Sequence, residues 1–241
     1  MEENLLIRTL RLKHFLSYGS EGEEIELKPL NVLIGPNASG KSNLIEAIGL
    51  LRATPKDLAE PIREGGGIGE WLWKGEKPSP TAEIEATVSH SKGNLPLRYR
   101  VSFAQVGQRM ELIDEAIEDE YPTRPDRSDP YFYYRYQRGN PILNVRDLSS
   151  DSSRSAADRT ERHLQREDLS PDQSVLSQRK DPDQYPELTF LGNRFADIRL
   201  YREWNLGRRS AFRLPQQADL SEDFLLENAS NLALVFNNLQ N

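Results

Sequence analysis

The stretch that decides the fold is LNVLIGPNASGKSNLIEAI, residues 30–48. The run 30–34 is apolar apart from one asparagine, as in a strand buried on both faces of a sheet. Residues 35–42, GPNASGKS, match the pattern G-x-x-x-x-G-K-[ST], and apolar residues then recur at the period of a helix over 41–52. Because this motif binds phosphate when it lies between a strand and a helix, the sequence predicts a phosphate-binding loop.

The chemistry of the motif gives each residue an expected role. Its glycines let the backbone N–H groups wrap around phosphate, and the positive end of the following helix adds to the attraction. Lys41 is expected to reach the β- and γ-phosphates of a nucleotide as the catalytic lysine, and the Ser42 hydroxyl to hold Mg²⁺. The predicted nucleotide-binding residues are Gly35, Pro36, Asn37, Ala38, Ser39, Gly40, Lys41, Ser42 and Asn43.

Strand patterns lie on both sides of this loop. Residues 6–15 and 23–27 are predicted as two strands separated by a turn. After the helix, the glycine-rich stretch 64–70 is predicted to be mobile or tightly turned, anchored by Trp71 and Trp73. Four further strands, separated by Pro, Gly and Asn, are predicted at 81–89, 95–103, 109–117 and 131–137, which indicates an antiparallel lobe.

The second half of the chain is less regular. Residues 147–183 are rich in Ser, Asp and Arg and hold few apolar side chains, so they predict an exposed helix or a flexible insertion. A helix is expected over 186–196, a strand over 198–204, and an amphipathic helix over 225–239. The apolar face of that last helix is formed by Leu232, Val235, Phe236 and Leu239.

These patterns predict four segments along the chain. The first, 1–60, holds the strand pair with the phosphate-loop strand and helix. The antiparallel lobe follows at 61–146, and the polar insertion at 147–185. The last, 186–241, is a helix–strand–helix segment that returns to the first.

Composition excludes several classes of site. The 241 residues contain no cysteine, which rules out disulfides, thiolate zinc sites and cysteine nucleophiles. His14, His90 and His163 are far apart and show no ligand spacing. With 31 Lys and Arg against 38 Asp and Glu, the net charge is −7, which argues against a surface that coats nucleic acid indiscriminately. No apolar run approaches the roughly 20 residues of a membrane span, and the N-terminus does not resemble a signal peptide, so we expect a cytoplasmic protein with no membrane partner.

The strand pair beginning LLIRTLRLKHFLSYG and the segment LNVLIGPNASGKSNLIEAI resemble one branch of the P-loop ATPases. That branch holds the structural-maintenance-of-chromosomes proteins, the RecF recombination protein, the overcoming-lysogenization-defect nucleases and the AAA-family predicted ATPases of bacterial defence systems (AAA_21-like). Its hallmark is the strand pair followed by G-x-N-G-S-G-K-S-N. The resemblance covers the first 55 residues and, less specifically, the last 55. It implies an α/β fold: a P-loop NTPase, the N-terminal part of an ABC-ATPase head, with an antiparallel β-rich lobe and a helical or flexible insertion.

Two positions depart from the family pattern. Ala38 stands where the family usually has Gly, which narrows the backbone angles open to the loop. Leu16 stands where many members carry a basic residue near the nucleotide, and Ser17, Tyr18 and Arg11 are weaker substitutes. Asn37 matches the pattern and is expected to position the γ-phosphate or the attacking water. Asn43 also matches and is expected to cap or pack.

The resemblance also implies a function. ATP and Mg²⁺ are the expected ligands, and the head is expected to form a homodimer on ATP and to drive a DNA-associated process such as repair or phage defence, with a nuclease or another effector as partner. Hydrolysis in this family needs a Walker B Asp-Glu and a signature Ser-Gly loop. No Ser-Gly-Gly signature is present, and the segment ELIDE at 111–115 is interpreted as a decoy inside the lobe. We therefore expect the catalytic carboxylates to lie beyond Asn241 and this chain alone not to turn over ATP.

Other functional interpretations remain open. A nucleotide-gated regulatory module without turnover is the main alternative, while a small-molecule kinase or a transporter subunit is less favoured. In the family a mobile glutamine senses Mg²⁺, so Gln173 is a candidate metal ligand and Gln178 a second candidate, with a solvated polar loop as the alternative.

Two stretches combine arginine with aromatic residues, as nucleic-acid surfaces do, but a structural face gives the same pattern. In YFYYRYQR, residues 131–138, strand packing is the favoured interpretation. In 190–214 the candidate nucleic-acid patch consists of Arg194, Arg199, Arg202, Arg208, Arg209 and Arg213, with Phe195, Tyr201, Trp204 and Phe212 interleaved.

Overall fold

The computed structural model describes residues 5–75, 80–90, 95–122, 129–137, 139–146, 159–202, 207–215, 217, 219–221 and 223–240. The chain forms two compact units, Met1–Asp197 and Ile198–Asn241. The first unit holds the sheet, the phosphate-loop motif and five α-helices, and the second holds one α-helix, among the residues described.

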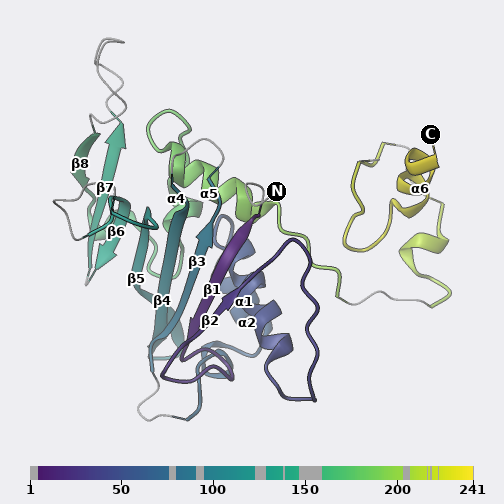
Figure 1. Ribbon diagram of the computed structural model, residues 1–241, viewed down its shortest axis with the longest axis horizontal. Helices are drawn as coiled ribbons and strands as arrows, with labels where there is room; N and C mark the ends of the chain where they lie inside the picture. Colours follow the sequence, from purple (N-terminus) through teal and green to yellow (C-terminus); the bar gives the residue numbers. More distant parts are fainter. Residues whose placement is uncertain are drawn as a thin grey trace. The chain divides into compact units, whose positions relative to one another are not determined.

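A single antiparallel sheet of eight strands organises the first unit (Figure 1). Its spatial order is β2-β1-β3-β4-β5-β6-β7-β8, so the phosphate-loop motif comes after the edge strand β2. The predicted antiparallel lobe and the predicted strand pair are confirmed, and they share this one sheet through the pairing of β1 with β3. The strands are β1 Ile7–Lys13, β2 Glu23–Glu26, β3 Ala82–Val88, β4 Leu97–Val106, β5 Arg109–Asp119, β6 Phe132–Gln137, β7 Asn140–Arg146 and β8 Arg159–His163.

One face of the sheet carries the core. Strict alternation on β3 and β4 sends Ile84, Tyr99 and Val101 to this face, where each is almost fully buried. The helices α1 (Lys41–Ala53) and α5 (Pro186–Ala196) contact each other, and the ring of Tyr99 lies 5.4 Å from that of Phe195 on α5. Both helices occupy the ranges predicted from the helical period, to within one residue.

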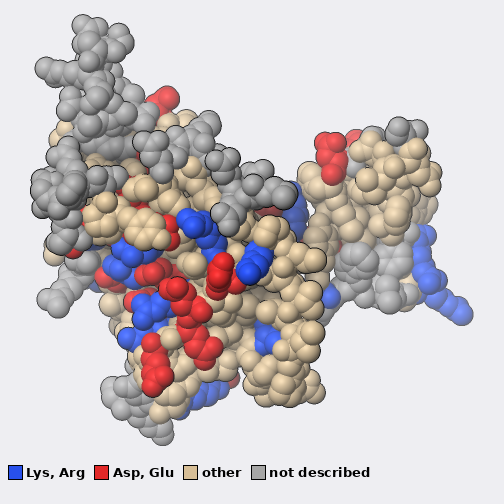
Figure 2. Space-filling model, viewed as in Figure 1, with Lys and Arg blue, Asp and Glu red and all other residues tan. Residues whose placement is uncertain are grey.

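The opposite face is charged. Glu118 of β5 accepts hydrogen bonds from Arg98 of β4 at 3.0 and 2.7 Å and from Arg135 of β6 at 3.3 Å. Figure 2 shows acidic and basic side chains interleaved over this part of the molecule. Cross-strand pairs of opposite charge stabilise a sheet, so this face needs no apolar cover. Arg135 thus belongs to a sheet ladder and Tyr134 to the core, which favours the packing interpretation of residues 131–137; Arg138 lies outside the described residues.

The glycine-rich stretch forms a tight turn between two short helices that the sequence did not predict. These are α2 (Ala59–Glu64) and α3 (Ile68–Trp71). Gly66 and Gly67 have φ angles of 96° and 92°, which only glycine adopts without strain. Trp71 is buried against Phe15, at 5.9 Å between ring centroids, and Trp73 stacks on His14 at 5.8 Å, as the prediction of aromatic anchors requires.

Three predicted elements differ in the structure. The predicted strand at 30–34 is wrong: it forms no strand, and Leu30, Val32 and Ile34 are 83%, 74% and 91% exposed. A strand that is apolar on both faces needs neighbouring strands on both edges and cover on both faces, and the described part of the chain supplies neither to this largely apolar segment. The predicted strand over 198–204 is also wrong for 198–202, which are irregular; 203 and 204 lie outside the described residues.

The third difference is the polar insertion, whose residues 147–158 lie outside the described part of the chain. Residues 159–183 are not an exposed helix: they include β8 and the one-turn helix α4 (Val175–Gln178). Val175 and Leu176 are each 1% exposed. Few apolar residues are enough here, because they dock on a core that the sheet already provides.

The amphipathic helix predicted over 225–239 is confirmed only for 232–239, as α6 (Leu232–Gln240); residues 225–231 are not helical. Its apolar residues are not buried: Phe236 is 57% and Leu239 76% exposed. In the described ranges, no helix combines the length and the apolar character that a membrane span requires, and no three His, Cys, Asp or Glu residues gather in a way that suits a metal ion.

A buried carboxylate joins α4 to the sheet. Glu115 of β5 points to the core face and is 1% exposed. It accepts hydrogen bonds from the Tyr99 hydroxyl at 2.8 Å, the Val175 backbone N–H at 2.9 Å and the Ser174 hydroxyl. Burial raises the pKa of Glu115 to about 6, although these donors oppose the shift.

This burial predicts a pH dependence of stability. Because the folded-state pKa of Glu115, about 6, exceeds the ordinary glutamate value of 4.5, the folded state binds the proton more tightly than the unfolded state does. The resulting stabilisation is complete below the unfolded-state pKa and is lost as the pH rises through about 6, a loss of about 2 kcal/mol. Glu115→Gln should not show this loss. Between about pH 4 and about pH 8, its free energy of unfolding should therefore rise by about 2 kcal/mol relative to that of the wild type, as measured by denaturant unfolding at each pH.

Glu60→Gln, at an exposed carboxylate on α2, is the control and should keep the wild-type profile. If the free energies of unfolding of Glu115→Gln and the wild type differ by the same amount at every pH in this range, the role given to the buried carboxyl is contradicted.

Candidate nucleotide-binding site

The predicted phosphate loop runs from Gly35 to Gly40 and leads directly into α1. Ala38 and Gly40 have positive φ angles, 65° and 85°. Ala38 therefore adopts the left-handed conformation that the usual glycine of the family adopts without strain. A Cβ on Gly40 would lie 3.0 Å from the Ser17 hydroxyl, so both the backbone angle and the space favour glycine there.

The start of α1 is suited to an anion. Its N-cap is Gly40, which has no side chain to cap the helix, and the first turn contains no acidic residue. The first N–H groups of a helix have no partner within the helix, and together with the helix dipole they attract negative charge. Ser42 is exposed at this end, where its hydroxyl is open to a ligand. The residues present therefore fit a bound phosphate.

Lys41 turns back into the loop. Its ammonium donates hydrogen bonds to the carbonyl oxygens of Gly35 and Pro36, at 2.8 and 2.6 Å, and to the Ser39 hydroxyl at 3.1 Å. One cation is thus held by three oxygens of the loop, all at exposed positions. Since these bonds are solvent-exposed, exchanging them for bonds to phosphate oxygens carries little desolvation cost.

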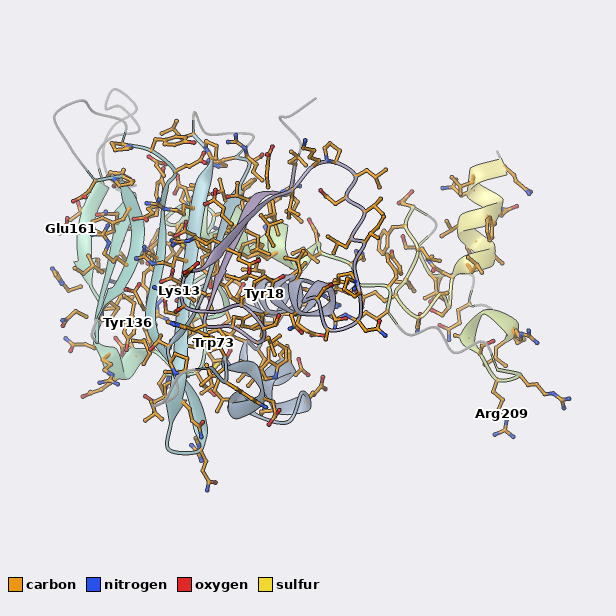
Figure 3. The ribbon with its side chains drawn as sticks, turned by 60° about the horizontal axis from the view of Figure 1, so that its bottom comes forward. Lys13, Tyr18, Trp73, Tyr136, Glu161 and Arg209 are labelled. Atoms are coloured by element: carbon orange, nitrogen blue, oxygen red, sulfur yellow. The ribbon has the colours of Figure 1, made fainter. Side chains whose placement is uncertain are left out.

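The turn after β1 supports the loop. The Asn43 side chain donates to the Ser17 hydroxyl at 2.8 Å, and the Tyr18 hydroxyl donates to the Gly40 carbonyl at 3.4 Å. Figure 3 shows Tyr18 beside α1. Burial and the charge of Glu23 raise the pKa of Tyr18, so its hydroxyl remains a donor. Ser17 and Tyr18, named above as weak substitutes for a basic residue, thus contact the loop, and Asn43 packs.

Gln173 is not brought to this site. Its amide donates to Asp57 at 2.7 Å, and its oxygen accepts from the Leu58 N–H at 3.2 Å. Asp57 follows the C-terminal end of α1, whereas Ser42 lies at the N-terminal end, roughly 18 Å away at 1.5 Å per residue. Gln178 donates to the Gln173 carbonyl at 2.9 Å. This placement corrects the prediction that Gln173 is a metal ligand and gives both glutamines a structural role.

The decoy interpretation of ELIDE, 111–115, agrees with the fold. The segment belongs to β5, in the middle of the antiparallel sheet. Asp114 and Glu115 point to opposite faces, Asp114 toward Arg100 and Glu115 into the core. Alternation along a strand separates the two carboxylates, so they do not form an Asp-Glu pair facing a nucleotide.

The six arginines of the candidate nucleic-acid patch are divided between the two units. Arg194 lies on α5 in the first unit and the other five in the second. The guanidinium of Arg199 stacks 4.2 Å above the Phe224 ring. Arg208, Arg209 and Arg213 are exposed, and Arg209 extends away from the chain in Figure 3. Trp204 lies outside the described residues.

Comparison with known proteins agrees with the motif. The family model described as "AAA domain, putative AbiEii toxin, Type IV TA system" (AAA_21) matches residues 30–237. The DNA replication and repair protein RecF of Limosilactobacillus fermentum is 34% identical over 109 residues, which are 45% of this chain and 26% of RecF. The DNA double-strand break repair Rad50 ATPase of Sulfolobus acidocaldarius is 34% identical over 92 residues, 36% of this chain and 10% of Rad50.

A solved structure from work on ATP-driven dimerisation and DNA-stimulated activation of SMC ATPases is 24% identical, with a TM-score of 0.33, and covers 44% of this chain and 72% of that one. At that TM-score the overlap adds no support. The chain spans 26% of the length of the RecF relative and 10% of the Rad50 relative. The family match, in contrast, extends over more than half of the chain, from the phosphate-loop segment into α6. The chain therefore belongs to this AAA family, within the branch of ABC-type, SMC- and RecF-like P-loop ATPase heads that its sequence resembles.

Proposed function

We propose that this chain binds ATP and Mg²⁺ at residues 35–43 and forms part of a cytoplasmic head that dimerises on ATP. The observation that carries the proposal is the position of Lys41, whose ammonium lies inside the 35–40 loop at the uncapped start of α1. Lys41 and the N–H groups of α1 would hold the β- and γ-phosphates. The Ser42 hydroxyl would hold Mg²⁺, which when bound neutralises developing charge on phosphate oxygens. Asn37, exposed in the same loop, would position the γ-phosphate or the attacking water.

The exposed segment 30–34 supports a larger head. Leu30, Val32 and Ile34 leave a β-prone apolar strip open immediately before the loop. Burying such side chains contributes about 1.5–3 kcal/mol each. We propose that a further β-strand of the head pairs with this segment and supplies the carboxylates for hydrolysis that β5 does not provide.

The process served by the head is proposed to involve DNA. RecF and Rad50, which match over 45% and 36% of this chain, are named for DNA repair. The family description names a putative toxin of a type IV toxin–antitoxin system, which favours a role in phage defence with an effector such as a nuclease.

A nucleotide-gated regulator without turnover is the second candidate. It is favoured by the position of Glu115, since the one segment that imitates Walker B is committed to the core. Turnover of ATP by the whole protein, measured as phosphate release, separates the two candidates: sustained release supports the ATPase, and binding without release supports the regulator.

Removing the loop cation should weaken ATP binding. Lys41→Ala deletes charge-assisted hydrogen bonds worth about 1.5–3 kcal/mol, so the Kd for Mg-ATP should rise about 10- to 100-fold in calorimetric titration. Lys56→Ala, at an exposed lysine beyond the C-terminal end of α1, is the matched control and should bind as the wild type does. Equal Kd values for Lys41→Ala and the wild type would refute the assignment of the loop.

A methyl group at Gly40 should distort the loop. Gly40→Ala places a Cβ at a φ of 85° and 3.0 Å from the Ser17 hydroxyl, which should lower the free energy of unfolding by about 1–2 kcal/mol and weaken ATP binding. The control is Gly69→Ala on α3, where the added Cβ meets only Gln105 at 3.7 Å. If Gly40→Ala and Gly69→Ala have the same free energy of unfolding in denaturant, the loop does not require glycine at this left-handed position.

Reversing two exposed charges should reduce DNA binding. Arg208→Glu with Arg209→Glu removes two phosphate-seeking cations from the second unit, so DNA affinity should fall and the salt dependence of binding should become shallower. Arg109→Glu with Arg162→Glu makes the same charge change at exposed positions of β5 and β8 and serves as control. Identical salt slopes for the two double variants would show that Arg208 and Arg209 do not contact DNA.

A further inference from the structure

The first unit contains a cavity that no residue of the phosphate loop lines. It has a volume of about 470 Å³ and lies between the core face of β5 and β6 and the segment 166–173. Glu111, Leu112, Glu115, Tyr134, Tyr136 and Pro171 form most of its wall. This volume is in the range of about 300–1,000 Å³ that is typical of pockets for small molecules.

The walls of this pocket are held in place. The Leu112 N–H donates to the Pro171 carbonyl at 2.7 Å, which fixes one wall to the sheet. The Ser170 N–H donates to the Gln178 side chain, and Gln173 bonds Asp57, each at 2.7 Å. Glu115 completes the frame through Ser174 and Val175. A frame with this many hydrogen bonds lowers the ordering cost of binding.

Polar groups converge on an otherwise apolar interior. Tyr134 is 2% exposed and lines the pocket, and its hydroxyl makes no hydrogen bond to any residue that the structure describes. Burial and the neighbouring Glu115 raise its pKa, so the hydroxyl keeps its proton. The hydroxyl is therefore available to hydrogen-bond with a ligand in the pocket.

The charges around the pocket favour a cation. Glu111, Glu115 and Glu167 line it together with one cation, Arg166. Glu111 lines the pocket from β5, and Glu167 lines it from the short turn at Arg166–Asp168. The excess of carboxylates disfavours anions such as nucleotides, and the Leu, Pro and Tyr walls favour a ring-sized apolar body.

We propose that this pocket binds a small organic cation, an amine or amidine carried on a ring-sized apolar body. The apolar body lies between Leu112 and Pro171, the cationic group lies toward Glu111 and Glu167, and the Tyr134 hydroxyl hydrogen-bonds to the ligand. The proposal is independent of the nucleotide site, because none of its lining residues belongs to the phosphate loop or to α1.

Three probes of one shape test the charge preference. 2-Naphthylmethylamine is the cation, 2-naphthalenemethanol its neutral analogue and 2-naphthoate the anion, each titrated into the whole chain by NMR or calorimetry. The amine should bind with a Kd about fivefold to tenfold lower than that of the alcohol, and the anion more weakly than both. Equal affinities for the amine and the anion, or no saturable binding of the amine, would overturn the proposal.

Matched variants on one strand test the location. Leu112→Trp fills the pocket and should abolish binding, whereas Ile113→Trp, at a neighbouring position of β5 that is 39% exposed and does not line the pocket, should leave it unchanged. Circular dichroism reports whether both variants fold. Retained binding by a folded Leu112→Trp variant would place the probe elsewhere and overturn the assignment.

A charge variant keeps the test decisive if Leu112→Trp does not fold. Glu111→Gln with Glu167→Gln should raise the Kd of the amine about tenfold and leave that of the alcohol unchanged. The control, Glu60→Gln with Glu70→Gln, removes two exposed carboxylates outside the pocket. If the two double variants bind the amine equally, the carboxylates do not select the cation.

Discussion

The hydrogen bonds of one buried carboxylate determine how the first unit is put together. Glu115 lies on the core face of the central strand β5, where burial raises its pKa to about 6. It accepts from Tyr99 of the neighbouring strand and from Ser174 and Val175 at the start of α4. A polar group that deep is tolerated because donors satisfy it, and those donors fix the position of a segment about sixty residues further along the chain.

This anchor extends toward the phosphate-loop helix. Ser174 and Val175 follow Gln173, which bonds Asp57 and Leu58 just after α1. The same segment forms one wall of the pocket beside Tyr134. This segment therefore contacts both the sheet and the end of α1, so a change in its position would alter both sets of contacts. The other end of α1 carries Gly40 and Lys41, so one helix lies between the insertion and the loop.

How far the sequence predicts this structure depends on where each side chain finds its partners. The β-strands with clear alternation, such as Ala82–Val88, were predicted because the alternation of apolar and polar side chains shows in the sequence which face of each strand is buried. The loop 35–42 was predicted because its chemistry is local. The prediction of a strand at 30–34 was wrong. A segment without alternation forms a strand only between neighbouring strands of a sheet, and the described part of the chain does not supply them. The role of Gln173 was missed because its partners lie more than a hundred residues away, and no local signal marks them. The pocket was missed for the same reason: Leu112 and Pro171 meet only in the fold.

The open segment before the phosphate loop also bears on how these 241 residues behave in solution. Leu30, Val32, Leu33 and Ile34 form a short, uncharged, β-prone run that is exposed along its length. Such a run is a template on which other chains can add strands, as in the early steps of aggregation. Proline at positions 29 and 36 limits the run to six residues, because proline cannot donate to a strand ladder. These two prolines act as gatekeepers, because they restrict the addition of strands to a short segment.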